Sequence, residues 1–176
     1  ATNEDSIKAI KNLKECGFKV LIHIMPNLPF SNPEKDIEMF DYILDSEDLQ
    51  VDEWEIYPTS VTTTSDKDNT EVYTVIEKWF NEGKYVPYSN DELFNVVIHA
   101  KENIHPYIRI SRIFRDIPKP NIVGGANVPN MRQVVQKIMH EEYGTRCNCI
   151  RCCEVKNKDY DNNDVFINTI SYKASK

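Results

Sequence analysis

The spacing of apolar residues along the chain predicts alternating helices and strands. In residues 6–15, apolar side chains recur near helical spacing between charged ones, which indicates an amphipathic helix that ends near Gly17. Residues 18–25 (FKVLIHIM) form a nearly continuous apolar run, typical of a strand buried on both faces of a parallel sheet. A helix followed by a buried strand is one unit of an α/β fold.

The first predicted strand ends in a loop with two prolines, Pro26 and Pro29, and a helix is expected over residues 33–44. Ligands collect at the carboxyl ends of strands in open sheets and barrels, so we expect His23 and Asn27 to face a small-molecule site. A single histidine in an apolar strand is also commonly a packed core residue, and the sequence leaves both interpretations open.

The later part of the chain repeats the alternation. A second strand is expected over residues 52–57 and again ends in a proline and a polar loop, so that two loops lie on one face of the sheet. The pattern also predicts amphipathic helices over residues 70–80, 91–100 and 130–140, and one further strand over residues 165–172.

A third strand over residues 107–113 (YIRISRI) alternates strictly, which predicts that Arg109 and Arg112 point to opposite faces. With Arg115 they place three guanidinium groups within seven residues. Such a cluster suits phosphate binding, because each guanidinium can form bidentate charge-assisted hydrogen bonds. The alternative is that Asp116 pairs with one arginine and that solvent covers the others.

Composition and charge narrow the functional classes. No apolar run approaches the roughly 20 residues that cross a bilayer. The first ten residues (ATNEDSIKAI) do not resemble a signal peptide. We therefore expect a cytoplasmic chain with reduced cysteines and no membrane partner. The net charge of −7 divides into −12 over residues 1–100 and +5 over residues 101–176. The basic part could face a polyanion, or the two parts are differently charged solvated surfaces.

Four of the five cysteines lie in residues 147–153 (CNCIRCC). Cys147, Cys149 and Cys152 could bind one tetrahedral metal ion such as zinc, with buried free thiols as the alternative. The adjacent Cys153 is expected to point elsewhere. A fourth ligand would come from a distant part of the chain, where the candidates are Cys16, His23, His99, His105 and His140. No HExxH-type base accompanies the cysteines, so such a site would be structural.

Five segments occur in a characteristic order: GFKVLIHIMPNLP, EIYPTSV, NEGKYVPYSNDEL, YIRISRIFRDIP and GTRCNCIRCCEV. Together they resemble the catalytic subunit of Elongator, a radical S-adenosylmethionine enzyme that starts carboxymethylation of the tRNA wobble uridine at C5. The resemblance covers residues 1–172. It implies an α/β fold with three parts: the later half of a partial TIM-type (radical SAM) barrel over residues 1–144, a zinc-binding cysteine loop over 145–158, and the start of an acetyltransferase-like segment over 159–176.

The same resemblance implies cofactors, partners and sites. The whole protein would use S-adenosylmethionine, an iron–sulfur cluster and acetyl-CoA, and this chain would hold zinc. Its partners would be tRNA, the remaining half of the barrel and other Elongator-type subunits. Matching motifs imply cofactor binding by His23, Asn27, Tyr57 and Thr59. They imply zinc ligation by Cys147, Cys149 and Cys152, and tRNA contacts by Arg109, Arg112 and Arg115.

The sequence also departs from the family pattern. Phe30 replaces the usual glycine after LP, and Asp68-Asn69-Thr70 replaces a glycine-threonine step after YPT, which loosens the expected cofactor loops. The cysteine triad that holds the family's iron–sulfur cluster is not in this sequence, so we do not expect the chain alone to cleave S-adenosylmethionine.

Two functions therefore remain open at this point: part of a radical tRNA-modifying transferase, or a non-catalytic zinc-stabilised tRNA-binding fragment or degenerate relative. A lysine acetyltransferase is a weaker third hypothesis, because nothing after Tyr172 could form a coenzyme A pocket. A C-x₃-C-x₂-C-type triad in a longer reading frame would favour the enzyme.

Overall fold

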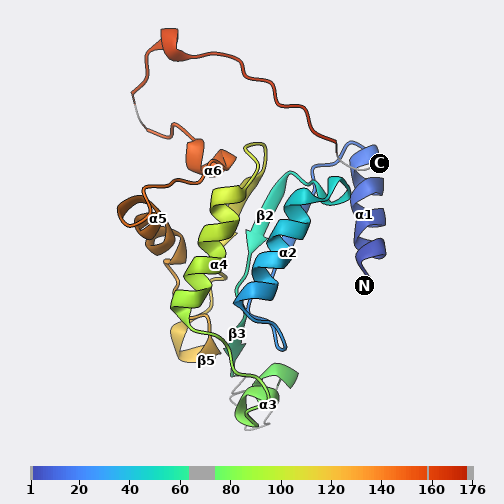
Figure 1. The fold of residues 1–176 in the computed structure, drawn as a ribbon, viewed down its shortest axis with the longest axis vertical. Coiled ribbons are helices and arrows are strands. Elements are labelled where there is room, and N and C mark those ends of the chain that lie inside the picture. The colour runs from blue at the N-terminus through green and yellow to red at the C-terminus, as the bar shows by residue number, and fades with distance from the viewer. Residues whose placement is uncertain (1, 64–73, 158, 174–176) are drawn as a thin grey trace.

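A three-stranded parallel sheet is the centre of the computed structural model, which describes residues 2–63, 74–157 and 159–173 (Figure 1). Its strands, in spatial order, are β1 (Leu21–Ile24), β2 (Glu53–Ile56) and β4 (Arg109–Ile113). The register sets Ile24 opposite Ile56, and Ile56 opposite Ile113. The α/β fold with a parallel sheet that the sequence predicts is confirmed.

Helices cover one face of this sheet. The helices α2 (Pro33–Asp45) and α4 (Asn90–Asn103) pack side by side on it, with α1 (Asn3–Glu15) near the β1 edge and α5 (Met131–Glu141) beside α4 (Figure 1). The interior between the two layers is apolar. Its fully buried side chains include Phe40, Trp54, Ile56, Val96 and Ile110.

Local signals in the sequence explain where these helices begin and end. Thr2 accepts a hydrogen bond from the Asp5 backbone N–H at 3.2 Å, and the Asp5 carboxylate accepts one from the Thr2 N–H at 2.8 Å. Asn32 caps α2 through the Lys35 N–H at 2.8 Å. Gly17 follows α1 with φ +81°, a conformation that favours glycine.

A second, two-stranded sheet follows the carboxyl end of β2. The strands β3 (Ser60–Thr62) and β5 (Ile122–Gly125) pair antiparallel, and α3 (Val75–Asn81) lies next to β3. The sequence pattern did not predict β3, β5 or α6 (Ile150–Cys153). Three 3₁₀ helices complete the described structure: η1 (Glu47–Leu49), η2 (Lys119–Asn121) and η3 (Asn162–Asp164). Residues 70–73 of the predicted helix over 70–80, and the Asp68-Asn69-Thr70 departure, lie outside the described residues.

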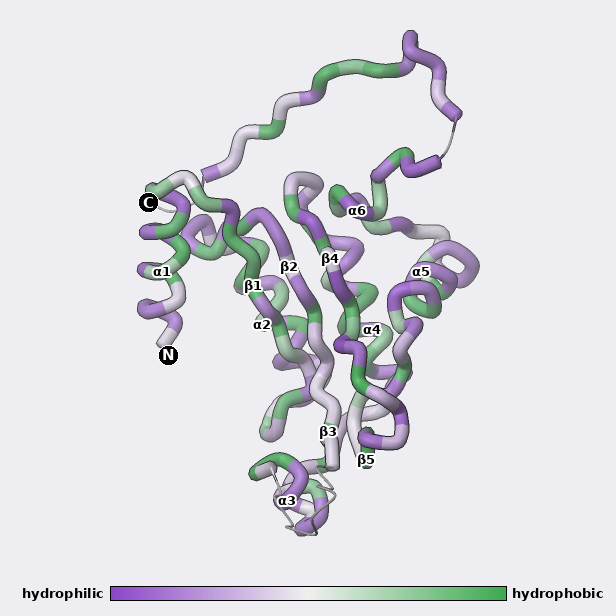
Figure 2. Tube along the Cα trace, turned by 180° about the vertical axis from the view of Figure 1, so that it is seen from behind, coloured by the Kyte–Doolittle hydropathy of each residue, from purple (hydrophilic) through white to green (hydrophobic). Residues whose placement is uncertain are grey.

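The expectation that β1 is buried on both faces is wrong. Ile24 is 4% exposed, but Leu21 is 41% exposed and the His23 side chain 57%. Figure 2 views the sheet from this uncovered side, where no described helix lies over the strands. An apolar run identifies a strand, but it does not reveal whether a second layer covers it. We call this side the open face.

The predicted alternation in β4 is also wrong. A β-bulge interrupts the β2–β4 register, so that Glu53 pairs with Arg109 and Glu55 pairs with Arg112. Because Glu53 and Glu55 are two residues apart on one strand, Arg109 and Arg112 share the open face. The extra residue of the bulge reverses the side-chain order that strict alternation predicts.

The strand predicted over residues 165–172 is not present. This segment has no ladder partner among the residues that the structure describes, and Phe166 and Ile167 are 82% and 96% exposed. The chain loops away from the sheet and returns to it near the end of α1 (Figure 1), where Lys14 donates a hydrogen bond to the Tyr172 hydroxyl. There the Tyr172 ring stacks on Tyr107 with centroids 3.9 Å apart. Alternating apolar residues form a strand only where an unpaired neighbouring edge is within reach.

Candidate functional site

Three cysteines form a compact group at the start of α6. The Sγ atoms of Cys147, Cys149 and Cys152 all lie within 4.8 Å of one another. Cys149 precedes the single turn of α6, and its carbonyl accepts the Cys152 N–H at 2.9 Å, which brings the two side chains to one side. The Ile150 N–H donates to the Ile108 carbonyl at 3.1 Å, which attaches the loop to the chain just before β4.

The group has the burial and spacing of a metal centre. Cys149 is fully buried, Cys147 is 6% exposed and Cys152 is half-buried. Tetrahedral zinc with Zn–S bonds of about 2.3 Å separates its sulfur ligands by about 3.8 Å, so small side-chain adjustments bring these atoms onto one ion. Cys153, next in sequence, is exposed and outside the group. The donor set therefore fits zinc.

The protein environment favours a thiolate at one member of this group, Cys152. Three donors point at the Cys152 Sγ: Lys101 Nζ at 3.6 Å, Gln136 Nε2 at 3.3 Å and an Arg132 guanidinium nitrogen at 4.0 Å. Hydrogen bonds from Cys147 and Cys149, with the charges of Lys101 and Arg132, hold the pKa of Cys152 far below its ordinary value. Hydrogen bonding to Cys149 and Cys152, and then burial, raise the pKa of Cys147.

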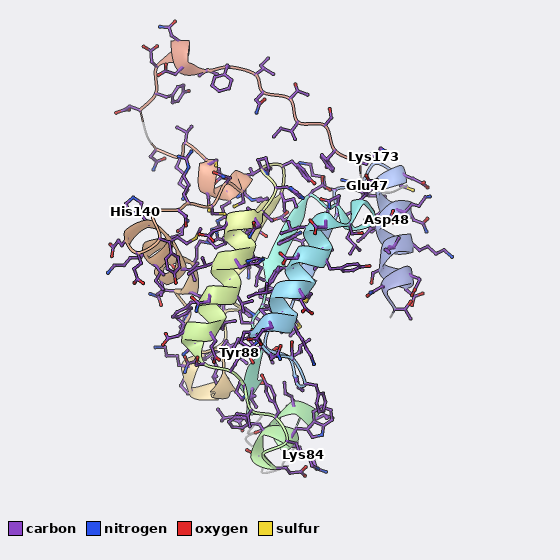
Figure 3. The ribbon with its side chains drawn as sticks, viewed as in Figure 1. Glu47, Asp48, Lys84, Tyr88, His140 and Lys173 are labelled. Carbon is purple, nitrogen blue, oxygen red and sulfur yellow. The ribbon has the colours of Figure 1, made fainter. Side chains whose placement is uncertain are left out.

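No fourth His, Cys, Asp or Glu joins the group in the part of the chain that the structure describes. Three of the candidate histidines have other partners: His23 contacts Glu55, His99 contacts Asp41, and His105 contacts the Leu44 carbonyl. Cys16 is exposed at the end of α1. His140, in the last turn of α5, lines a cavity of about 570 Å³ together with Cys147 and Cys152 (Figure 3).

A second cavity, of about 370 Å³, lies at the carboxyl ends of β1 and β2. It is lined by His23, Met25, Tyr57, Pro58, Ser60, Arg115 and Ile117. We call it the strand-end cavity. His23 and Tyr57, which motif matching assigns to a cofactor site, are thus brought together, with ring centroids 5.1 Å apart.

Glu55 organises this region, although the sequence analysis did not single it out. Its carboxylate lies 2.9 Å from His23 Nε2, accepts the Tyr57 hydroxyl at 2.6 Å and lies 3.7 Å from Arg112 Nε. Burial and the bond to Glu55 raise the pKa of Tyr57. The alternation of DEWEIY places Glu53, Glu55 and Tyr57 on one face, and this was the signal that could have identified Glu55.

Asn27 and Thr59 do not line the strand-end cavity. Asn27 is 2% exposed with φ +65°, and its amide oxygen accepts the Tyr88 N–H at 3.1 Å. Its own N–H donates to the buried Asp36 carboxylate at 2.6 Å. Thr59 Oγ1 donates to the Pro26 carbonyl at 3.1 Å. Both side chains therefore shape the loops around the cavity. Two supports of these loops were missed from the sequence: Asp36, and Tyr88 (labelled in Figure 3), whose hydroxyl donates to the Asp36 carboxylate at 2.8 Å.

The three arginines of the basic cluster have different surroundings. Arg109 forms an ion pair with Glu154. Arg112 lies between Glu55 and Asp116, 3.9 Å from the latter, so pairing of one arginine with Asp116 is confirmed. Arg115 lines the strand-end cavity. Arg109 and Arg112 therefore lie on the open face, Arg109 at the amino end of β4, and only Arg115 lines the candidate cofactor site.

Comparisons with known proteins identify the family. Residues 51–141 match the model described as the Radical_SAM C-terminal domain, and the chain belongs to this family. No helix among the described residues has the length and apolarity that a membrane span requires.

Individual proteins of known sequence or structure are also similar to the chain. The chain is 41% identical over 154 residues, 88% of its length, to a tRNA uridine(34) acetyltransferase of Methanocaldococcus jannaschii. It is 35% identical over 81% of its length to Elongator complex protein 3 of Saccharomyces cerevisiae. The solved structure of Methanocaldococcus infernus Elp3, with N-terminal residues 1–46 deleted, matches 86% of the chain with a TM-score of 0.75 and 38% identity. The resemblance to the Elongator catalytic subunit is confirmed. The chain spans 27%, 24% and 33% of these three proteins.

Proposed function

We propose that this chain is part of a transferase that modifies the wobble uridine of tRNA, in which it forms the later half of a radical SAM barrel. The observation that carries the proposal is the 41% identity, over 88% of the chain, to a protein named tRNA uridine(34) acetyltransferase. In the proposed division, residues 1–144 belong to the barrel, 145–158 form the zinc loop and 159–176 begin an acetyltransferase-like segment. The remaining half of the barrel would cover the open face.

In this proposal the strand-end cavity binds S-adenosylmethionine. His23 and Tyr57 line it, and Glu55 orients both side chains through contacts of 2.9 and 2.6 Å. Asn27 and Thr59 do not line the cavity; their buried hydrogen bonds hold the loops around it in place. Bound S-adenosylmethionine with an iron–sulfur cluster would supply a radical, and acetyl-CoA the transferred carbon unit. This chain's residues orient the cofactor and exclude water from it.

The arginines of the basic cluster are proposed to contact the tRNA backbone. Arg112 and Arg115 lie at the carboxyl end of β4, beside the cavity, where a substrate uridine would enter. Their charges offset the acidic residues of the first hundred positions, which would otherwise repel a polyanion. Zinc held by Cys147, Cys149 and Cys152 would anchor the loop that follows α5 to β4.

The test uses the full-length protein that contains this chain and a tRNA with uridine at position 34. We expect His23→Ala to abolish S-adenosylmethionine-dependent modification while tRNA binding is retained. The control is Lys137→Ala, which changes a side chain that is 71% exposed on α5, away from the open face. Modification at the unchanged rate in His23→Ala would refute the cavity assignment. A wild-type protein that binds tRNA but never modifies it would establish the non-catalytic alternative.

A further inference from the structure

Lys101 is a fully buried lysine on the core-facing side of α4. It follows Leu93 and Val97 at four-residue spacing, and both of these side chains are at most 1% exposed. At such a position helices carry apolar residues, since a buried ammonium without an anionic partner is strongly unfavourable. The lysine therefore needs an anion inside the protein.

The cysteine group is the partner that the fold places beside this ammonium. The hydrogen bond that Lys101 Nζ forms among the described residues runs to the Cys152 Sγ at 3.6 Å. No carboxylate within ion-pair distance of Lys101 is found in the described part of the chain. Lys101 and Cys152 are 51 residues apart in sequence, so the fold alone brings them together.

The charge of a metal–thiolate centre explains why a cation would lie at this position. Three thiolates around one divalent ion would leave a formal charge of one negative unit, which the Lys101 ammonium and the Arg132 guanidinium both offset. Arg132 and Gln136, one turn apart on α5, donate to the same sulfur from the more exposed side. Lys101 is the donor on the buried side of the centre.

We propose that Lys101 is the internal counter-ion of the three-cysteine metal centre, a positioning residue that orients the Cys152 sulfur and raises the affinity for zinc. The inference rests on the proposed zinc site. Outer-shell partners of metal ligands typically change metal affinity by about 10- to 100-fold when removed. We expect an effect of this size for loss of the Lys101 charge.

The experiment measures zinc affinity of the purified chain by competition with a chelator of known affinity. Lys101→Met removes the charge and keeps the length of the side chain, Lys101→Gln is a second neutral variant, and Lys101→Arg keeps the charge. The control is Lys137→Met on α5, where the side chain is 71% exposed. Both neutral variants should bind zinc at least tenfold more weakly, while Lys101→Arg and Lys137→Met retain near-wild-type affinity.

Cobalt substitution adds a readout that a purely structural role would not change. A nearby cation stabilises the thiolate electrons, so the thiolate-to-cobalt absorption band should move to lower energy in the neutral variants and not in Lys101→Arg. If the neutral variants bound zinc as tightly as the wild type and showed an unshifted band, the counter-ion proposal would be overturned and the proposed zinc site would stand. It would also be overturned if Lys101→Arg lost zinc as severely as Lys101→Met, because shape rather than charge would then matter. A wild-type chain without zinc would reject the metal site as well.

If neither neutral variant folds in excess zinc while Lys101→Arg folds and binds it, the requirement for charge is upheld. Circular dichroism records the fold of each variant.

Discussion

Substitution of Cys149 by serine tests whether metal binding stabilises the fold. Cys149 is fully buried in the centre of the cysteine group, and its backbone carbonyl begins α6. Serine has nearly the same shape but is a poor zinc ligand. At free zinc of about 1,000 times Kd, a single site stabilises the native state by about 4.1 kcal/mol. For a chain of this size, that corresponds to a rise in Tm of about 8–16 °C.

The assay is calorimetry of each protein with zinc and with a chelator, combined with elemental analysis of bound metal. We expect about one zinc per wild-type chain and the full zinc-dependent rise in Tm. Cys149→Ser should lose both, and Cys153→Ser should keep both, because Cys153 is exposed and outside the group. Comparing each protein with and without zinc removes the intrinsic cost of the serine. The reasoning would be refuted by an equal rise in all three proteins, or by a Cys153→Ser loss matching that of Cys149→Ser.

Three further predictions address other parts of the molecule. Alanine at each arginine of the basic cluster should weaken tRNA binding in a gel assay, whereas Lys137→Ala should leave it unchanged. The slope of log affinity against log salt concentration should fall by about 1 for each phosphate that is no longer neutralised. Equal slopes in the wild type and the arginine variants would remove the assignment. Burial raises the pKa of Asp52, but hydrogen bonds from Lys14 and the Val20 N–H outweigh burial and lower it overall from 3.8. The stability that Asp52 contributes, about 1–3 kcal/mol, is therefore present above pH 3.8 and lost as pH falls through the lowered pKa. Urea unfolding across this range should show that loss in the wild type and not in Asp52→Asn, and parallel curves would disprove it. Gly125→Ala should destabilise by more than about 2 kcal/mol, because its Cβ would lie 2.5 Å from the Thr59 carbonyl oxygen at φ +74°. Gly17→Ala, at φ +81° with open space around it, should lose only about 1–2 kcal/mol, and equal losses in urea unfolding would contradict the clash.

The proposed sites share the central sheet. The cysteine loop attaches just before the amino end of β4 through Ile150, whereas Arg112 and Arg115 follow towards its carboxyl end. A loop that detaches after metal loss would disturb the strand that presents the proposed tRNA contacts. Metal removal is therefore expected to weaken tRNA binding even though the cysteines need not touch the nucleic acid.

The local elements of this protein could be predicted from its residues alone. The pattern of apolar and polar residues predicted α1, α2, α4 and α5 and located β1, β2 and β4, all within a few residues of their observed bounds. These features depend on hydrogen bonds and side-chain periods within a few positions, so neighbouring residues specify them. The grouping of three cysteines was predictable for the same reason: the three residues are five positions apart at most.

The way these elements combine is set by tertiary contacts. The bulge in β4 placed Arg109 and Arg112 on one face, and the uncovered side of the sheet exposed His23. The contact between Lys101 and Cys152 joins residues 51 positions apart. Such features depend on pairing register and on which surfaces meet, and a periodic pattern contains neither. A buried lysine on the apolar side of a helix became interpretable only when its partner was located.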